Sequence, residues 1–465
     1  MNKYKKLSIN TLIMFIGTTG SKLISFIMLP FYTKWLSVSD YGITDSINTY
    51  VSLLIGVISL CLCDAIFIFP SKQIKEVQKK YFSTGFIFGF SLFCFAFIIL
   101  LILHFFIHSE NVFFNYIWFI YLMTFTLFLE NYVQQFLRGQ NKLILFSTTG
   151  IIYTVLLTFF SVIMIPKYGV IGYALGMLFA NIIATIAIFF ISKTYQYFSV
   201  CSFDKNKLRE MLKYAFPLVP NSVMWWVISA INRPILENYV GTEGIGLYSI
   251  ANKFPSLIAV VFTIFSNSLM VSIIEEYGKD NYRSFFNKIY KMIFYFQILG
   301  ITILIVVSPY IIKMVTKNQD YYQAWIYMPI LAISVLFSNC SSFLGCNFSV
   351  SKETKYFFYS SIIGAGTALT MNLILIPTFG IWGAVLSSVF ANLFMLFSRE
   401  IFSRKIVIIN NKLSYYILIT LVLLLFFTVK KAKIYLEIII CFFIVGLLIV
   451  GFVNTIKEIK YEEKN

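Results

Sequence analysis

The sequence predicts an all-α polytopic membrane protein with about fourteen transmembrane helices. Hydrophobic residues make up 59% of its 465 positions and charged residues only 12%, whereas soluble domains carry about 25% charge. Apolar runs of about 20 residues, long enough to cross a bilayer as helices, recur along the whole chain. These observations exclude a soluble enzyme or a soluble binding domain, and an internal repeat divides the helices into two halves.

The predicted spans follow the apolar runs in chain order. They cover residues 9–34, 41–69, 81–107, 113–136, 143–165, 169–191, 213–236, 244–272, 287–308, 321–345, 355–376, 380–398, 412–429 and 434–453. The first span is too long for a signal-peptide core and lacks a small-residue cleavage site, so we expect it to be retained. The longest outer loop, near residues 309–320, leaves little room for an extramembrane catalytic domain.

Charge placement sets the expected orientation. Most of the Lys and Arg residues behind the net charge of +17 fall in loops on the side of the N-terminus. Inner loops of membrane proteins carry this excess, so both termini are expected in the cytoplasm. The surplus charge therefore reflects topology and contact with membrane lipids, and it gives no reason to expect a nucleic-acid partner.

The two halves of the chain repeat each other. Residues 165–181, IPKYGVIGYALGMLFAN, match residues 376–392, IPTFGIWGAVLSSVFAN, at an offset of 211. At an offset of 204 the opening helices match as well. The matched pairs there are Pro30/Pro234, Gly42/Gly246, Asn48/Asn252, Ser52/Ser256 and Leu53/Leu257. A duplication of this kind predicts two pseudo-symmetric six-helix lobes.

The repeat gives the expected domain division. Residues 1–195 form the first lobe, 196–212 a basic cytoplasmic connector, and 213–405 the second lobe. Residues 406–465 have no counterpart and form two additional helices with a cytoplasmic tail.

Five stretches of the sequence carry a family resemblance. They are LPFYTKWLSVSDYGITDSINTY at 29–50, RGQNKLILFS at 138–147, INRPILENYVGTEGIGLYSIANKF at 231–254, and the two IP-x-x-G-x-x-G blocks. In order and spacing they resemble the polysaccharide-export branch of the multidrug/oligosaccharidyl-lipid/polysaccharide (MOP) exporter superfamily. Within it, the chain is most similar in character to O-antigen and capsule repeat-unit flippases.

The resemblance implies a fold and an activity. The fold is a V-shaped bundle of two six-helix lobes that opens alternately to each face of the membrane. The activity is passage of an undecaprenyl-pyrophosphate-linked oligosaccharide from the inner to the outer leaflet. These flippases often carry an acid just before the arginine of the seventh helix, where this chain has Asn232.

Three cations lie within or beside apolar spans, where each costs about 2.5–3.5 kcal/mol on insertion scales. Along a helix, Lys22 lies roughly 18 Å and Lys253 roughly 14 Å below the outer end of its span. Arg233 lies near the outer end of the seventh span. We expect all three to attract a diphosphate headgroup. The alternatives are lysines that extend along their helices to water and an arginine that anchors to lipid headgroups.

Polar residues also recur at helical spacing on the second and eighth spans. Asn252 and Ser256 belong to the stripe on the eighth span, and Asn48 occupies the equivalent place on the second. A lipid-facing helix needs no such stripe, whereas the wall of a hydrated cavity does. Asn221 and Trp225 of the seventh span are predicted near the same cavity, where an indole suits a sugar ring; packing is the alternative for Trp225.

Two acids within the spans are candidates for ion coupling. Asp64 lies near the inner end of the second span, where an interfacial position is the alternative. Glu130 lies in the inner half of the fourth span. Its alternative is structural pairing with the polar residues that follow it on the same helix. These are Asn131, Gln134, Gln135 and Arg138.

No set of catalytic residues emerges, and no cofactor or metal motif is found; seven cysteines without paired spacing argue against a disulfide framework. The leading hypothesis is a monomeric flippase for lipid-linked oligosaccharide, with a polysaccharide polymerase or chain-length protein as candidate partner. The alternatives are a small-molecule drug antiporter of the same superfamily and a membrane polysaccharide polymerase or ligase. The glycan carried and the energy source are not determined by the sequence.

Overall fold

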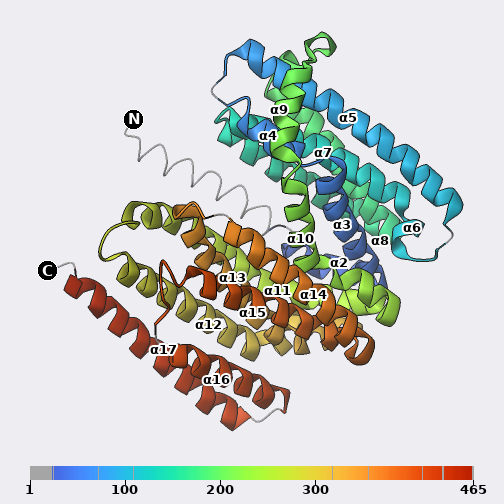
Figure 1. The fold of residues 1–465 in the computed structure, drawn as a ribbon. Helices are drawn as coiled ribbons and strands as arrows, with labels where there is room; N and C mark the ends of the chain where they lie inside the picture. The colour runs from blue at the N-terminus through green and yellow to red at the C-terminus, as the bar shows by residue number, and fades with distance from the viewer. Residues whose placement is uncertain are drawn as a thin grey trace. The chain divides into compact units, whose positions relative to one another are not determined.

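The computed structural model of the chain is helical throughout the part that it describes (Figure 1). It describes residues 24, 26–71, 73–107, 109–316, 318–353, 355–410, 412–431 and 434–462. Within these ranges the secondary structure consists of α-helices with a few short 3-10 turns and no strand. The prediction of an all-α polytopic membrane fold is confirmed.

The described part of the chain divides into two compact units. The first contains the residues up to Trp226 together with Gly241–Gly246, and the second contains Val227–Val240 and the chain from Leu247 onward. The helices of the first unit are α2 (Leu29–Trp35), α3 (Val38–Ile58), α4 (Leu62–Ile68), α5 (Lys75–Phe106), α6 (Val112–Asn115), α7 (Ile117–Gly139), α8 (Leu143–Ile191) and α9 (Lys205–Ala215).

Two helices pass from one unit into the other, α10 (Leu218–Ala230) and α11 (Asn232–Glu276). The remaining helices belong to the second unit. They are α12 (Tyr282–Val315), α13 (Met328–Val350), α14 (Lys355–Phe379), α15 (Ile381–Ser403), α16 (Lys412–Lys430) and α17 (Ile434–Glu462). The 3-10 turns lie at Thr194–Tyr197, Val200–Ser202 and Gln319–Ile326.

The helices are long and apolar enough for a polytopic protein. Within the described ranges, nine helical stretches could each cross a membrane, or ten if the bent pair α3 and α4 is one span. The α8 helix has 49 residues, about 73 Å of helix against a bilayer core of roughly 30 Å. It therefore represents two spans, and its backbone turns at Gly169. Because a long helix that breaks in this way counts as two spans, the observed helices are consistent with about fourteen spans.

The internal repeat is visible in backbone geometry. Gly169 (φ 54°, ψ −126°) and its repeat partner Gly380 (φ 57°, ψ −128°) adopt the same conformation, which side-chain-bearing residues rarely adopt. Three residues later, a Cβ on Gly172 would lie 2.3 Å from the Met164 carbonyl oxygen. One on Gly383 would lie 2.1 Å from that of Leu375. Both repeats therefore use one glycine to turn the chain and one to let two helices meet.

A second pair of repeated glycines lies where α3 crosses the start of the second half of α11, inside the first unit. A Cβ on Gly42 would lie 1.8 Å from the Thr242 carbonyl oxygen, and one on Gly246 would lie 2.0 Å from that of Val38. The contact is reciprocal because Thr242 and Gly246 are the 204-residue counterparts of Val38 and Gly42. The Ser39 and Thr242 hydroxyls are also 2.6 Å apart.

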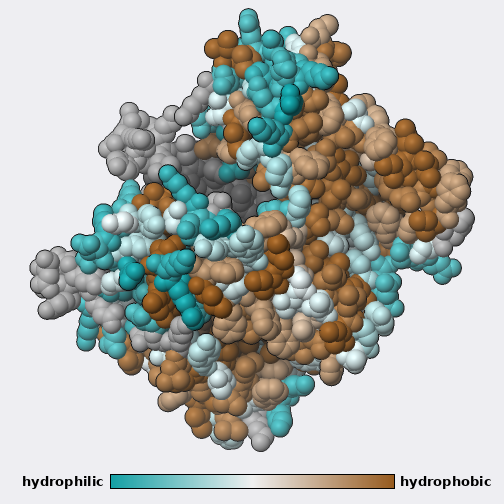
Figure 2. All heavy atoms as spheres, viewed as in Figure 1, coloured by the Kyte–Doolittle hydropathy of each residue, from teal (hydrophilic) through white to brown (hydrophobic). Residues whose placement is uncertain are grey.

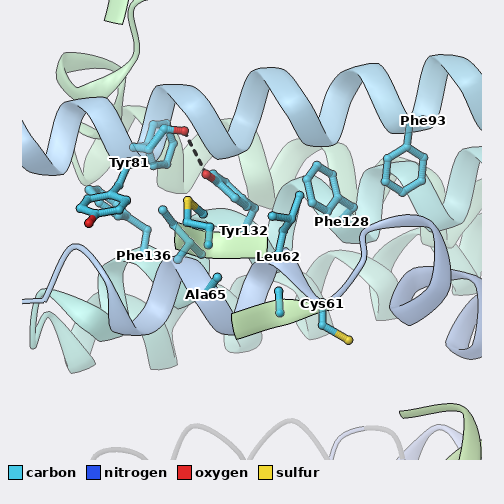
Figure 3. Packing of buried hydrophobic residues seen from close by; sticks show 12 residues of the cluster. Cys61, Leu62, Ala65, Tyr81, Phe93, Phe128, Tyr132 and Phe136 are labelled. Carbon is cyan, nitrogen blue, oxygen red and sulfur yellow. Dashed lines mark hydrogen bonds between the residues drawn. The ribbon is translucent and has the colours of Figure 1, made fainter. Parts of the chain in front are cut away.

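An aromatic core fixes the helices of the first unit (Figure 3). Phe93 on α5 and Phe128 and Tyr132 on α7 are fully buried in it, together with Leu62 on α4. The Tyr132 hydroxyl donates to the Phe82 carbonyl at 2.9 Å. This bond satisfies the one polar group of an otherwise apolar contact, so it fixes the position of α7 against α5.

The second predicted span is broken in the structure. The α4 helix is bent by 60° from α3, and the intervening Leu60 and Cys61 have positive φ values of 49° and 55°. Non-glycine residues rarely adopt this conformation. The C-terminal part of α5, in contrast, has a hydrophobic surface (Figure 2), with exposed side chains such as Phe95, Ile98 and Phe106, as expected for a helix that faces lipid.

Candidate functional site

Not every residue predicted for the site is described by the structure. Lys22 lies outside the described residues, and so does the side chain of Asn267 from the stripe on the eighth span. The other predicted residues fall into the two units, which are described in turn.

Arg233 is held inside the second unit, with a side chain only 8% exposed. Its Nη1 donates to the Ser229 carbonyl at 2.6 Å and to Asn232 Oδ1 at 2.9 Å. The guanidinium carbon lies 5.0 Å from the centre of the Tyr248 ring. Asn232, which replaces the acid of related flippases, thus still accepts a hydrogen bond from this arginine. The interactions fix the guanidinium in place, which suits it to bind a planar or tetrahedral anion.

A chain of polar contacts leads from Tyr248 into α15. The Tyr248 and Ser388 hydroxyls are 3.0 Å apart. The Ser388 carbonyl accepts from Ser334 on α13 at 2.8 Å, and Asn392 Nδ2 donates to Ser334 Oγ at 3.0 Å. These contacts link α11, α13 and α15 within the second unit. Among these residues the sequence marked only Asn392, because it is the last residue of the repeated stretch 376–392.

Lys253 is exposed on α11, and its neighbours on the predicted stripe are half-buried. Ser256 Oγ donates to the Lys253 carbonyl at 2.6 Å, which turns this hydroxyl back onto its own helix. Asn252 is half-buried and Ser249 is buried. The stripe therefore runs from the packed side of α11 to its exposed side, with the ammonium group at the exposed edge.

In the first unit, Asn48 belongs to a cluster of tyrosines. Its Nδ2 donates to the Tyr173 hydroxyl at 3.1 Å. The Tyr32 ring meets the Tyr173 ring edge-on at 5.9 Å, and its hydroxyl lies 3.4 Å from Ser161 Oγ. The cluster joins α2, α3 and both halves of α8. Sequence reasoning identified Asn48 from its repeat partner, whereas neither tyrosine has a tyrosine in the other half to mark it.

The predicted residues of α10, Asn221 and Trp225, are four residues apart and share one side of that helix. Trp225 is 37% exposed, and Asn221 is half-buried. Trp226, one residue on, packs instead, since its Nε1 donates to the Thr49 carbonyl at 2.9 Å. Ser222 lies against Gly56 of α3. Of the two adjacent tryptophans, Trp225 is the more exposed.

The two predicted acids differ in environment. Glu130 is 4% exposed and accepts a hydrogen bond from Gln134 Nε2 at 2.9 Å. Arg138 does not reach it; its guanidinium lies 4.6 Å from the centre of the Phe67 ring. Asp64 is exposed on α4. Within the described ranges, no group of three or more His, Cys, Asp or Glu residues is placed to hold a metal ion.

Two family models match the chain. The model of the polysaccharide biosynthesis protein family matches residues 7–261, more than half of the chain. The MatE model matches residues 217–374. No curated protein sequence matches the chain significantly.

Solved structures match the fold over most of the chain. A structure of the lipid II flippase MurJ, in an inward closed conformation, has a TM-score of 0.69 at 18% identity and covers 98% of this chain and 100% of its own. A MOP superfamily transporter from Pyrococcus furiosus has a TM-score of 0.60 at 14% identity, covering 85% and 94%. A variant of a MATE transporter from Vibrio cholerae has a TM-score of 0.58 at 14% identity, covering 86% and 97%.

The duplicated helical fold is thus the fold of the MurJ and MOP superfamily transporter structures. The chain itself belongs to the polysaccharide biosynthesis protein family, as the resemblance predicted.

Proposed function

We propose that the protein is a flippase that moves an undecaprenyl-pyrophosphate-linked oligosaccharide from the inner to the outer leaflet of the bacterial cytoplasmic membrane. The cargo would be a repeat unit for O-antigen, capsule or another surface polysaccharide. Transport would proceed by alternating access. The protein would be a monomer with both termini in the cytoplasm. Its two lobes would be residues 1–195 and 213–405, joined by the connector at 196–212.

The observation that carries this proposal is the extent of the structural match. The MurJ structure covers 98% of the chain, whereas the superfamily transporter from Pyrococcus furiosus covers 85%. The two C-terminal helices, α16 and α17, lie in the part of the chain beyond the duplicated halves. MurJ is a lipid II flippase, and its structure matches nearly the whole chain. This match favours a lipid-linked cargo over a small soluble one.

The cations give the proposal its chemistry. Arg233, held by Asn232 and Ser229, and Lys253 at the exposed edge of the α11 stripe would bind the diphosphate, with Lys22 as a third cation. At an effective dielectric near 20, one ion pair at 4 Å is worth about 4 kcal/mol, comparable with the cost of placing a cation in the membrane. Such binding would offset the cost of the buried charges only when substrate is present.

The polar groups would accommodate the sugars. Asn252 and Ser256 beside Lys253, and Asn48 with Tyr173 in the first unit, supply amide and hydroxyl groups. Asn221 and the exposed face of Trp225 would add a stacking surface. A polysaccharide polymerase or chain-length protein would act on the product at the outer leaflet.

The test is a strain that lacks the protein and carries a plasmid-borne copy. We expect unflipped lipid-linked glycan to accumulate on the cytoplasmic leaflet without the plasmid and to clear when the wild-type chain is supplied. Lys253→Gln should fail to clear it, whereas Lys313→Gln, an exposed lysine in the last turn of α12, should clear it normally. Normal clearance by membrane-inserted Lys253→Gln would contradict the assigned role of this cation.

A drug antiporter is the second candidate, because the MatE family model matches residues 217–374. It predicts resistance to a toxic organic compound, lost in the deletion strain, with no change in lipid-linked glycan. A deletion strain with unchanged drug tolerance and accumulated glycan would exclude it.

A further inference from the structure

The segment that follows α8, residues 192–216, is packed tightly onto the first unit. Met211 and Ala215 of α9 are fully buried in its aromatic core. A Cβ on Gly85 of α5 would lie 2.8 Å from Met211 Cε, so α9 and α5 meet closely. Ahead of α9, the Ser83 hydroxyl donates to the Tyr197 carbonyl at 3.0 Å. These contacts make the segment a fixed surface of the first unit.

Three cations, which we call the cation row, line one side of α9. Lys205, Arg209 and Lys213 are spaced by four residues, so they share a side of the helix other than the one that buries Met211 and Ala215. All three are exposed, and none makes an ion pair within the described ranges. Like charges at this spacing destabilise a helix. The cation row therefore favours an anionic partner.

The acids of the same segment are engaged elsewhere. Asp204 Oδ1 accepts from the Asn206 N–H at 2.9 Å and so caps the start of α9. Glu210 Oε1 accepts from Lys207 Nζ at 3.0 Å. Residues 1–23, which the structure does not describe, contain no Asp or Glu that could supply a further acid. The positive charge of the cation row is thus in excess over the acids of this segment.

Two further cations, which we call the lysine pair, lie beside this segment. Lys75, the first residue of α5, donates from Nζ to Gln196 Oε1 at 3.0 Å and lies 5.7 Å from the centre of the Tyr197 ring. Lys142, just before α8, is half-buried. Burial, and then the charge of Lys75, lower the pKa of the Lys142 ammonium group. An anion beside the two ammonium groups would relieve this repulsion.

Exposed apolar side chains lie between the end of α8 and the cation row. They are Tyr195, Phe198, Val200 and Phe203, which are from 37% to 69% exposed. The segment begins where the second half of α8, long and apolar enough to span a membrane, ends at Ile191. Hydrophilic and hydrophobic side chains gather together over α9 and the turns before it (Figure 2). At a membrane surface such apolar side chains enter the boundary between headgroups and acyl chains, while neighbouring cations stay at the headgroups.

We propose that residues 192–216, with the lysine pair beside them, form a binding surface for the headgroups of anionic phospholipids such as phosphatidylglycerol. The cation row and the lysine pair bind the phosphate groups, and the exposed apolar side chains enter the membrane surface. An acidic protein would match the cations, but the position of the apolar side chains at the end of a membrane span favours lipid. The inference goes beyond the proposed function, since it uses none of the residues assigned to the cargo and requires no transport.

The test is thermal unfolding of the purified full-length protein in a non-ionic detergent, with phosphatidylglycerol or phosphatidylcholine added at equal mole ratio. We expect phosphatidylglycerol to raise the Tm of the wild type by about 2 °C or more above its value in phosphatidylcholine. Added salt should reduce this gain. Lys205→Gln/Arg209→Gln/Lys213→Gln should lose most of the gain and keep its Tm in phosphatidylcholine. Val200→Ser/Phe203→Ser should reduce the gain as well, at unchanged charge.

The matched control is Lys352→Gln/Arg404→Gln/Lys405→Gln, which removes the same charges from exposed positions of the second unit. It should keep the full gain. A wild type that phosphatidylglycerol does not stabilise, or an equal loss of the gain in the two triple variants, would overturn the proposal. Inorganic phosphate that reproduces the whole gain would overturn it as well, because a small soluble anion would then be sufficient.

Discussion

The two repeats share their backbone but not their buried charges. In the first repeat, Glu130 on α7 is buried with only a neutral glutamine as donor. Its counterpart 211 residues later is Ser341, whose carbonyl accepts from Arg399 at 3.0 Å. Arg399 is 1% exposed and also donates to Ser360 Oγ at 3.0 Å, while its own counterpart is the apolar Ile188.

The difference shows that the two repeats have kept the same helix geometry, while their buried charged residues have diverged. The glycines at the two turns repeat because other residues rarely adopt their φ and ψ values, and the same conformation is needed in both halves. The buried acid and the buried arginine do not repeat. Arg399 donates to a backbone carbonyl and a hydroxyl of neighbouring helices, whereas Glu130 accepts from Gln134 on its own helix.

The largest expected effect comes from the glycines where helices meet. In Gly172→Ala and Gly383→Ala, the new Cβ would lie 2.3 Å and 2.1 Å from backbone carbonyl oxygens, which cannot rotate away. We expect each to lose about 3 kcal/mol of unfolding free energy, the upper end of overpacking costs, visible as a low yield of monodisperse protein. Gly366→Ala, with nothing within 4 Å of its Cβ, should be tolerated. Unimpaired folding of both Gly172→Ala and Gly383→Ala would contradict the claim that the two repeats need a glycine where their helices meet.

The turn glycines should respond by the same amount in both repeats. Gly169→Ala has no atom within 4 Å of its Cβ, and Gly380→Ala only an ordinary contact at 3.6 Å. The cost is therefore conformational, about 1–3 kcal/mol for a side-chain-bearing residue held at this φ and ψ. Thermal unfolding should show similar Tm losses for the two variants. A large loss in one and none in the other would show that the turns are not equivalent.

Asn392 and Asn181 occupy the same place in the repeat and should behave differently. Asn392 donates to Ser334 Oγ and the Ser388 carbonyl, so Asn392→Leu should cost about 1–2 kcal/mol. Asn181 Oδ1 makes no hydrogen bond in the described part of the chain, so Asn181→Leu should cost less than Asn392→Leu in thermal unfolding. Equal destabilisation of both variants would mean that Asn181 is a structural residue like its counterpart.

The smallest effect is expected for the buried charged side chains themselves. Arg399→Met loses hydrogen bonds to Ser341 and Ser360 but also the cost of burying a cation, a net loss of about 1 kcal/mol. Glu130→Gln replaces a buried carboxyl group by a neutral amide, so its unfolding free energy should be unchanged or raised. Thermal unfolding of the two variants measured side by side would decide this, and a severe loss in Glu130→Gln would mean that the carboxylate charge is compensated.

The fold could be predicted from the sequence because the two features that determine it, the apolar spans and the glycine turns, can each be recognised in a short stretch of sequence. Apolar length marks each span, and the repeated IP-x-x-G-x-x-G blocks mark the turns that Gly169 and Gly380 make. The break at Leu60 and Cys61 could not be predicted, since neither residue is a glycine or proline and the strained conformation depends on tertiary packing.

The candidate site was less predictable. Asn48 and Asn252 could be chosen because the repeat marks them, and Arg233 because a cation in a span is rare. Tyr173, which bonds to Asn48, is one of 30 tyrosines in the sequence, and nothing local distinguishes it.

The central claim is that the protein carries a lipid-linked diphosphate oligosaccharide across the membrane. The most direct measurement places the purified protein in liposomes containing a polyprenyl diphosphate oligosaccharide and follows access of a sugar-specific hydrolase to it over time. The account predicts protein-dependent transfer to the opposite leaflet that falls to the protein-free rate in Lys253→Gln and is normal in Lys313→Gln. No transfer by the wild type, in liposomes where the same protein exports an organic dye, would contradict it.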